Sequence, residues 1–146
     1  MKRRLAAGIV LRSTKQVKVI SERKRNYTAA VVVPAAGHGH RMGQLGQPKQ
    51  YIPLLGDPIL LWTLRACAAA PSVSELVLVV AEADVEYCRA RWRSDGRVDK
   101  PVTVTAGGRS RQESVYAGLR AIERPVDLVA VHDGVRPLLE PSLLER

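Results

Sequence analysis

A glycine-rich segment with two basic side chains follows the first apolar run of this 146-residue chain. The segment runs from Gly37 to Tyr51 and contains Arg41 and Lys49. Glycines let backbone N–H groups approach phosphate oxygens, and two cations beside those groups suit a polyphosphate. Taken alone, the same segment also fits an ordinary solvated loop. A second candidate segment, Asp133 to Pro137, places a carboxylate shortly before Arg136.

Two common phosphate-binding motifs are excluded by spacing. Residues 37–43 follow G-x-G-x-x-x-G, which is one residue too long for the dinucleotide pattern G-x-G-x-x-G. The chain contains no G-x-x-x-x-G-K-[ST] sequence, so a standard P-loop is absent. His38 and His40 have no cysteine or acidic residue at a metal-ligand spacing. The glycine-rich segment therefore needs its structural surroundings to be interpreted.

Alternating strands and helices must position the two segments. Short apolar runs predict strands at residues 31–36, 76–81, 102–105 and 128–132. Proline and capping signals predict helices at residues 58–70, 84–93 with Asp84 as N-cap, 110–123 with a capping box from Ser110 to Glu113, and from Pro141 onward. The connection between residues 37 and 57 has no predicted element, and loops of this length are usually functional or disordered.

This alternation predicts an α/β fold with a mostly parallel sheet of order 3-2-1-4 and right-handed crossovers. In such a sheet the first and fourth strands are neighbours, and their crossovers leave on opposite faces. Ligands bind at this switch point, beyond the carboxyl ends of the strands. We therefore expect the segments 37–51 and 133–137 to lie together there.

Composition and charge exclude several classes of protein. Hydrophobic residues make up 46% and charged residues 25%, which is typical of a globular domain rather than a disordered or fibrous chain. No apolar run approaches the roughly 18 residues of a membrane span. Cys67 and Cys88 are too few for a disulfide framework, and no secretory signal is recognisable. These features favour a cytoplasmic protein without a membrane partner.

The net charge of +9 is concentrated at the N-terminus. Residues 1–28 hold nine Lys or Arg and one Glu, which gives +8 and leaves +1 for residues 29–146. The nearly neutral remainder gives no electrostatic reason to expect a nucleic acid in its cleft. We interpret residues 1–28 as a disordered extension and residues 29–146 as the folded domain. A plastid or other organelle transit peptide, an RNA-seeking arm and an upstream stretch from a wrong start codon remain alternatives for the extension.

Three motifs in the right order resemble a known family. Residues 35–42 (A-A-G-H-G-H-R-M) and 48–51 (P-K-Q-Y) resemble the A-A-G-x-G-x-R-M…P-K-Q-[YF] signature of nucleotide-sugar-type cytidylyltransferases. Residues 107–119 resemble their G-G-x-x-R-x-x-S-V-x-x-G-L segment, and residues 131–137 resemble their V-H-D-x-x-R-P segment. The most similar family is that of the 2-C-methyl-D-erythritol 4-phosphate cytidylyltransferases of the non-mevalonate isoprenoid pathway. Ribitol-5-phosphate cytidylyltransferases are near relatives.

The resemblance covers residues 29–146 and implies a Rossmann-like nucleotidyltransferase fold of the GT-A type. It also implies a reaction in which a phosphate oxygen of a sugar-alcohol phosphate attacks the α-phosphate of CTP. Pyrophosphate leaves, with Mg²⁺ present. Because negative charge builds on the α-phosphate and on the leaving group, the site needs preplaced cations and N–H donors.

Roles are carried over to the residues that match the motifs. The resemblance implies that Arg41 and Lys49 are catalytic cations, that Asp133 holds Mg²⁺ and that Arg136 grips the phosphate of the sugar alcohol. It further implies nucleotide binding by Ala35, Ala36, Gly37, Gly39, Gly108 and Ser114. Asp133 also suits a helix cap or turn, and Ser114 also suits an ordinary early-helix serine. Arg109 departs from the family pattern, in which Asp or another polar residue is common.

The chain is shorter than the members of this family. The resemblance therefore implies that a C-terminal part is absent, including the arm that forms the homodimer and groups that hold the second substrate. We expect impaired transfer and a tendency to aggregate, because the fourth predicted strand is apolar throughout and would lack a neighbour. A ribitol-5-phosphate enzyme and a non-catalytic relict that binds nucleotide remain the alternatives.

Overall fold

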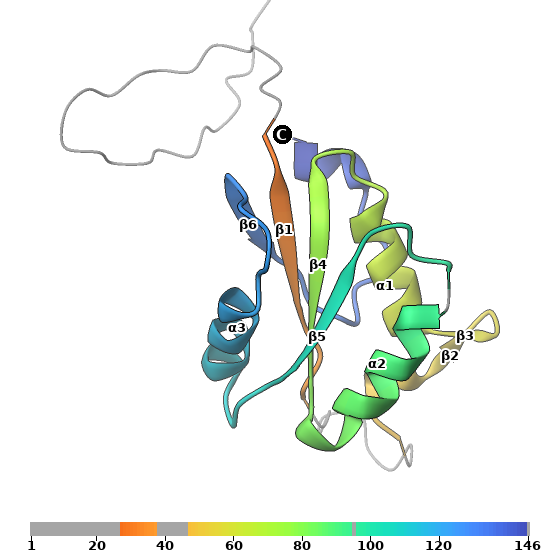
Figure 1. Ribbon diagram of the computed structural model, residues 1–146. Helices are drawn as coiled ribbons and strands as arrows, with labels where there is room; N and C mark the ends of the chain where they lie inside the picture. The colour runs from red at the N-terminus through yellow and green to blue at the C-terminus, as the bar shows by residue number, and fades with distance from the viewer. Residues whose placement is uncertain (1–26, 38–46, 95, 146) are drawn as a thin grey trace, which may run out of the picture.

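A four-stranded parallel sheet forms the centre of the molecule (Figure 1). The computed structural model describes residues 27–37, 47–94 and 96–145. The strands are β1 (Ala29–Pro34), β4 (Val73–Val80), β5 (Val102–Ala106) and β6 (Leu128–Val131), in the order β5-β4-β1-β6. All three neighbouring pairs are parallel. Counted in chain order, these are strands 3-2-1-4, so the predicted order is confirmed.

Helices cover both faces of this sheet. Helices α1 (Ile59–Ala68) and α2 (Val85–Ser94) lie on one face, and α3 (Arg111–Arg120) lies on the other (Figure 1). Pro58 is the N-cap of α1 rather than its first residue. The capping box predicted for α3 is confirmed, because the Ser110 side chain accepts from the Glu113 amide and the Glu113 carboxylate accepts from the Ser110 amide.

Several short elements were not predicted. The connection after β1 contains the 3-10 helix η2 (Lys49–Tyr51), and strands β2 (Pro53–Leu54) and β3 (Asp57–Pro58) form a separate antiparallel pair. The expectation of a segment without elements was therefore wrong. A 3-10 helix, η3 (Glu82–Asp84), precedes α2, and η4 (Pro141–Glu145) stands where a further α-helix was expected. Hydrophobic periodicity does not detect one-turn elements, because they are shorter than one period of the pattern.

The core lies on both sides of β1 and β4. The side chains of Val31, Val32 and Val33 are all fully buried, which confirms a strand covered on both faces. Val31 and Val33 pack toward the α1 and α2 side, whereas Val32 packs with Val77 and Val79 toward α3. Strand β1 therefore cannot move relative to its neighbours without opening the core, and its carboxyl end is a firm base for a site.

Strand β6 differs from the other strands because it lies at an edge. It pairs with β1, and within the described residues no strand pairs with its outer edge. Leu128, Val129 and Val131 are 45%, 42% and 42% exposed. The sequence analysis expected this apolar strand to lack a neighbour on one side, and the described residues agree.

Both cysteines lie in the interior of the domain. Cys67 and Cys88 are both free and fully buried, and burial raises the pKa of each thiol, that of Cys67 to about 12.

The Tyr27 hydroxyl donates to the Leu144 carbonyl, and the Thr28 amide donates to Asp127 Oδ2. The chain is thus attached to the fold from residue 27, and the extension predicted for residues 1–28 lies, up to residue 26, outside the described part. No helix in the described ranges is long and apolar enough to cross a membrane.

Candidate active site

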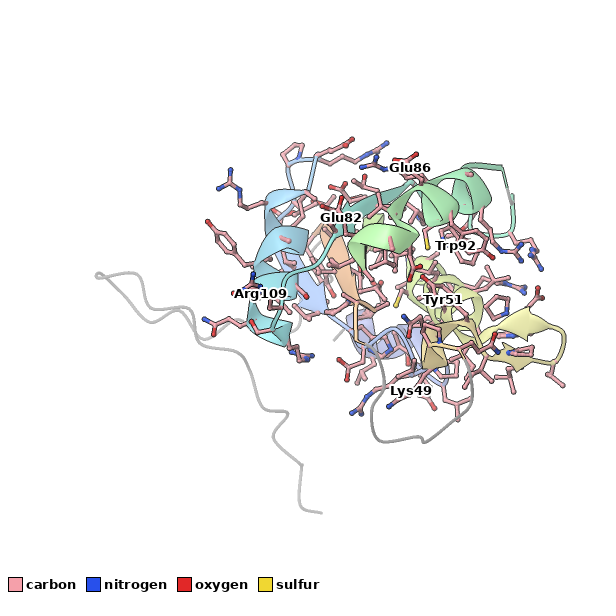
Figure 2. The ribbon with its side chains drawn as sticks, turned by 90° about the horizontal axis from the view of Figure 1, so that it is seen from below. Lys49, Tyr51, Glu82, Glu86, Trp92 and Arg109 are labelled. Carbon is pink, nitrogen blue, oxygen red and sulfur yellow. The ribbon has the colours of Figure 1, made fainter. Side chains whose placement is uncertain are left out.

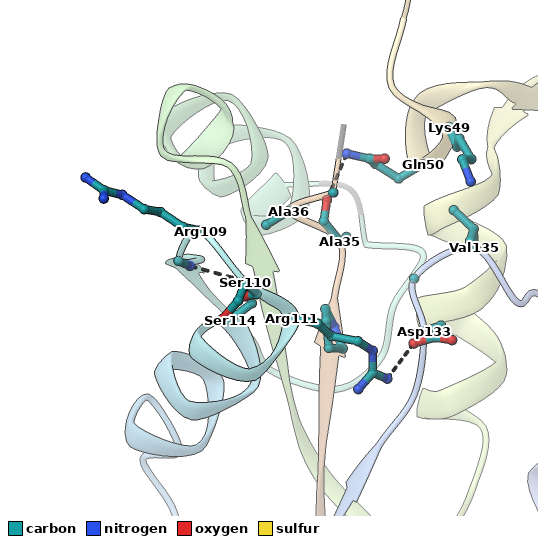
Figure 3. Close-up of a pocket in the computed structure, with 14 residues that line it drawn as sticks. Ala35, Ala36, Lys49, Gln50, Arg109, Ser110, Arg111, Ser114, Asp133 and Val135 are labelled. Carbon is teal, nitrogen blue, oxygen red and sulfur yellow. Dashed lines mark hydrogen bonds and ion pairs between the residues drawn. The ribbon is translucent and has the colours of Figure 1, made fainter. Parts of the chain in front are cut away.

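A cavity of about 480 Å³ opens at the carboxyl ends of the parallel strands (Figure 3). Such a volume is within the range of small-molecule sites. The cavity, called here the strand-end cavity, is lined from four directions: the end of β1, helix η2, the turn before α3 and the turn after β6. Seven of the predicted site residues line it: Ala35, Ala36, Gly37, Lys49, Gly108, Ser114 and Asp133.

Three predicted site residues are placed differently. Arg41 and Gly39 lie outside the described residues, so their predicted roles stay predictions. Arg136 does not line the strand-end cavity but lies beside it, in a neighbouring hollow that also contains His132. The His132 Nε2 atom is 2.9 Å from the Arg136 carbonyl oxygen, which closes the turn between them.

Asp133 lies between two guanidinium groups. Arg111 Nη2 is 2.8 Å from Asp133 Oδ1, and Arg136 Nε is 3.0 Å from Asp133 Oδ2. The hydrogen bond from Arg111, helped by the charges of both arginines, holds the pKa of this carboxyl below its usual range despite partial burial. Both oxygens are therefore engaged and the group is ionised at neutral pH.

Lys49 reaches the strand-end cavity from helix η2. It is half-buried, and within the described residues it has no carboxylate partner. Tyr51, two residues on, anchors the same short helix to η3 and α2. Its hydroxyl donates to Asp84 Oδ2 of η3 at 3.0 Å and lies 3.4 Å from Cys88 Sγ of α2. Figure 2 shows Tyr51 on the α2 side and Lys49 on the other side. A cation held without a counter-charge at a cavity mouth suits an anionic ligand.

The end of β1 forms a wall of small residues. Gln50 Nε2 donates to the Ala35 carbonyl at 2.8 Å, and the Ala35 amide donates to the Val79 carbonyl at 2.7 Å. Both the amide and the carbonyl of Ala35 are therefore engaged in hydrogen bonds that stabilise this wall. The backbone groups of Ala36 and Gly37 have no hydrogen-bond partner within the described residues, so they are available to a ligand.

The opposite wall is the Gly107–Gly108 turn at the start of α3. Ser114 is buried, and its hydroxyl donates to the Ser110 carbonyl at 3.0 Å and accepts from the Gly108 amide at 3.2 Å. A Cβ atom at Gly108 would collide with the Glu113 side chain, so only glycine fits here. Ser114 lines the cavity, but its hydroxyl hydrogen is donated to the Ser110 carbonyl and not to the cavity. The side chain therefore helps to shape the wall by stabilising the turn.

Arg111 and Gln50 are among the lining residues that were not assigned a role from the sequence. Arg111 occupies the fixed arginine position of the G-G-x-x-R segment, and that position was the signal that could have identified it. Gln50 lies in the P-K-Q-Y motif, but an amide gives no sign in sequence of the carbonyl that it will meet. Arg109 points away from the cavity with its guanidinium (Figure 3).

A divalent cation fits this cavity only together with a phosphate ligand. No group of three or more His, Cys, Asp or Glu side chains that could hold a metal is present in the described part of the chain. Among the described residues, Asp133 is the single carboxylate that lines the cavity. Mg²⁺ commonly takes one or two carboxylates and completes its shell with phosphate oxygens and water. The donor set therefore fits an ion that is carried in by a polyphosphate.

The chain matches the family described as 2-C-methyl-D-erythritol 4-phosphate cytidylyltransferase over residues 29–146. A relative of that name from Acidobacterium capsulatum is 46% identical over 121 residues, which cover 80% of this chain and 50% of the relative. The chain thus spans about half the length of the curated relatives that it matches.

Solved structures agree on the fold. The 4-diphosphocytidyl-2C-methyl-D-erythritol synthase of Anaerococcus prevotii is similar with a TM-score of 0.65 and 27% identity, over 82% of this chain and 48% of that one. A Mycobacterium tuberculosis protein solved in complex with manganese has a TM-score of 0.56 and 24% identity, over 82% of this chain and 57% of that one. At that identity the likeness concerns the fold alone.

Proposed function

Since the chain belongs to the 2-C-methyl-D-erythritol 4-phosphate cytidylyltransferase family, we propose that its strand-end cavity binds CTP for the transfer of CMP to 2-C-methyl-D-erythritol 4-phosphate. Pyrophosphate is the other product. The observation that carries the proposal is the grouping of Lys49 and Arg111 with a lone carboxylate at the carboxyl ends of the strands. A polyphosphate is the ligand that such a set of groups fits best.

The base of the nucleotide would lie between the wall of small residues and the Gly107–Gly108 turn. The main-chain groups of Ala36 and Gly37 have no partner within the described residues and can pair with the edge of a cytosine. Gly108 brings backbone, rather than a side chain, to the opposite side. Small residues on both sides let the base approach the main chain closely, and the family resemblance implies that the resulting pocket is too narrow for a purine.

The triphosphate would lie toward the cations. Lys49 supplies a mobile point charge, and Arg111 supplies a planar fork that can hold two oxygens. Such groups stabilise the charge that develops on the α-phosphate and on departing pyrophosphate. Arg41 is added on the strength of its motif position, together with backbone N–H groups of residues 37–41, as the family resemblance implies. In the sequence, residues 37–41 lie in the segment that connects β1 to η2.

Asp133 is the group that would hold Mg²⁺ in this cavity. When bound, the ion would neutralise the phosphates and make the α-phosphorus a better acceptor for the incoming oxygen. A triphosphate offers the two guanidinium groups alternative anions, and one oxygen of Asp133 can then turn to the ion. Arg136 would be left to meet the phosphate of the acceptor, from the hollow beside the cavity.

Calorimetric titration of the 146-residue chain with CTP and Mg²⁺ tests this proposal. We expect saturable binding that is weakened about tenfold by Lys49→Ala, a typical loss for one charged contact to phosphate. Lys100→Ala is the matched control, because Lys100 has no contact with the cavity. Titration with cytidine separates base from phosphate, since Lys49→Ala should leave cytidine binding unchanged. The absence of saturable CTP binding, or equal effects of the two lysine variants, would contradict the proposal.

A further inference from the structure

Buried polar side chains are few in the described part of the chain, and three of the four serve the strand-end cavity. They are Gln50, Thr63, Glu75 and Ser114. Gln50 holds the Ala35 carbonyl and Ser114 holds the Gly108 amide, as described above. Glu75 lies elsewhere and accepts from the Glu123 and Arg124 amides. Thr63 is the third that serves the cavity, although it does not line it.

The Thr63 hydroxyl links helix α1 to the turn after β6. Its Oγ1 atom lies 3.0 Å from the Gly134 carbonyl oxygen, 71 residues away in sequence, and 3.3 Å from the Ile59 carbonyl one turn earlier in α1. A helical threonine can always bond to the carbonyl of its own helix. The shorter contact to Gly134 shows that this hydroxyl also serves another segment. Thr63 is fully buried, so water cannot replace it.

The turn that receives this hydrogen bond is held from two sides. The Gly134 amide donates to the Pro34 carbonyl at 3.2 Å, while the Gly134 carbonyl accepts from Thr63. A Cβ atom at Gly134 would lie 2.9 Å from Ala35 Cβ and 3.3 Å from Leu60 Cδ1, so the turn packs directly on β1 and α1. These contacts fix the position of the turn, and the position of the turn sets the direction of its side chains.

We propose that Thr63 is a positioning residue that fixes Asp133 and, through Asp133, the guanidinium groups of Arg111 and Arg136. The inference rests on the proposed function, because the groups that it positions are those assigned to CTP and its metal ion. Asp133 directly precedes the glycine that Thr63 holds, and both arginines bond to its carboxylate. A shift of the turn therefore moves three charged side chains together.

Loss of the hydroxyl has a definite physical consequence. Thr63→Val keeps the shape of the side chain and removes the donor, which leaves the buried Gly134 carbonyl without this partner. A buried carbonyl that loses its donor favours a rotation of the turn toward another donor or toward water. Thr63→Ser keeps the hydroxyl and removes only a methyl group. The two variants thus separate hydrogen bonding from packing.

Calorimetry with CTP and Mg²⁺ tests the inference, at a temperature at which every variant is folded. We expect Thr63→Val to weaken binding about tenfold, since small displacements of positioning groups are costly, and Thr63→Ser to stay within about threefold of the parent. Thr103→Val is the matched control, because Thr103 lies on β5 away from the cavity and has no side-chain hydrogen bond within the described residues. A role in stability alone would lower the melting temperature of Thr63→Val and leave the CTP dissociation constant unchanged, which would overturn the inference while the proposed function stands.

A second measurement does not depend on the nucleotide. Amide hydrogen exchange reports the Gly134 and Arg136 N–H groups, which donate to the Pro34 and Asp133 carbonyls. We expect faster exchange at these two amides in Thr63→Val than the change in global stability explains, and parent-like rates in Thr63→Ser. If the parent chain does not bind CTP, the proposed function fails, and the exchange rates then decide on Thr63 alone. Equal protection in Thr63→Val and the parent would overturn the positioning role.

Discussion

Arg111, in the first turn of α3, and Asp133, in the turn after the edge strand β6, meet at the strand-end cavity with 2.8 Å between Nη2 and Oδ1 (Figure 3). The Arg111 side chain is 66% exposed and that of Asp133 is 33% exposed. Exposed ion pairs contribute little to stability. The contact therefore positions two charged groups at the cavity and contributes little to the stability of the fold.

Replacement of Arg111 should separate binding from stability. We expect Arg111→Ala to change the free energy of unfolding by less than about 1 kcal/mol, because the pair is solvated. CTP binding in the presence of Mg²⁺ should weaken about tenfold, because a fork for two phosphate oxygens is lost. Denaturant titration and calorimetry measure the two effects. Arg120→Ala on the same helix is the control and should change neither; an equal loss of affinity in both variants would show that Arg111 acts only through net charge.

Base preference should follow from the wall of small residues. We expect CTP to stabilise the chain against heat more than ATP or GTP, because Ala36 and Gly108 line the cavity and the family resemblance implies a base pocket there that is too narrow for a purine. Ala36→Leu should abolish the CTP effect and keep the response to pyrophosphate, because the cations are untouched. Thermal shift assays measure both. Equal stabilisation by the three nucleotides would show that the base is not bound at this wall.

The basic extension should be dispensable for nucleotide binding. We expect deletion of residues 2–26 to leave the dissociation constant of CTP within about twofold at 0.15 M salt, because salt screens surface charge and the described chain enters the fold at the amino end of β1, whereas the cavity lies at the carboxyl end. Deletion of residues 2–28 should in addition lower the melting temperature, because it removes the hydrogen bonds of Tyr27 and Thr28 to Leu144 and Asp127. A tenfold loss of affinity in the shorter deletion would mean that the extension contributes to the site.

Stability should fall in acid partly through Asp133. Its pKa in the folded chain is lowered, chiefly by the hydrogen bond from Arg111, whereas an unfolded Asp titrates near about 3.9. The stabilisation is thus complete above that value and is lost as the pH falls through the lower, folded pKa. We expect denaturant midpoints between pH 5 and pH 3 to fall less steeply in Asp133→Asn than in the parent. Asp99→Asn, at a position without an ion pair within the described residues, should keep the parental slope.

The central strand β1 and the capping box could be predicted because their signals are local, whereas the strand order followed from the general topology of alternating strands and helices. The apolar run at residues 31–33 and the sequence from Ser110 to Glu113 carry their own structural information. The position of the cavity followed from the order of the strands, which brings the ends of β1 and β6 together. Seven of the ten predicted site residues accordingly line one cavity. Their roles remain proposals.

The contacts that shape the cavity could not be predicted, because each joins distant parts of the chain through one polar atom. Thr63 looks in sequence like any polar residue on a helix, and nothing in its neighbourhood indicates the Gly134 carbonyl. The same holds for Gln50 and the Ala35 carbonyl. Helix η2, which carries Lys49, is one turn long and is anchored by Tyr51 to Asp84 rather than by its own pattern. Tertiary contacts decide these details.

The two buried thiols can serve as probes of local and global unfolding of the chain. Cys67 lies inside α1, whereas Cys88 lies beneath Tyr51, in contact with the short helix that carries Lys49. An exposed thiolate attacks electrophilic thiol reagents, so neither cysteine should react until the residues that cover it move aside. Modification of Cys88 without Cys67 would then mark a local lifting of the Lys49 segment, and modification of both at one rate would mark unfolding of the whole domain. A ligand that bridges the cavity should slow the modification of Cys88, because the Lys49 segment must lift away from the ligand before this thiol is exposed.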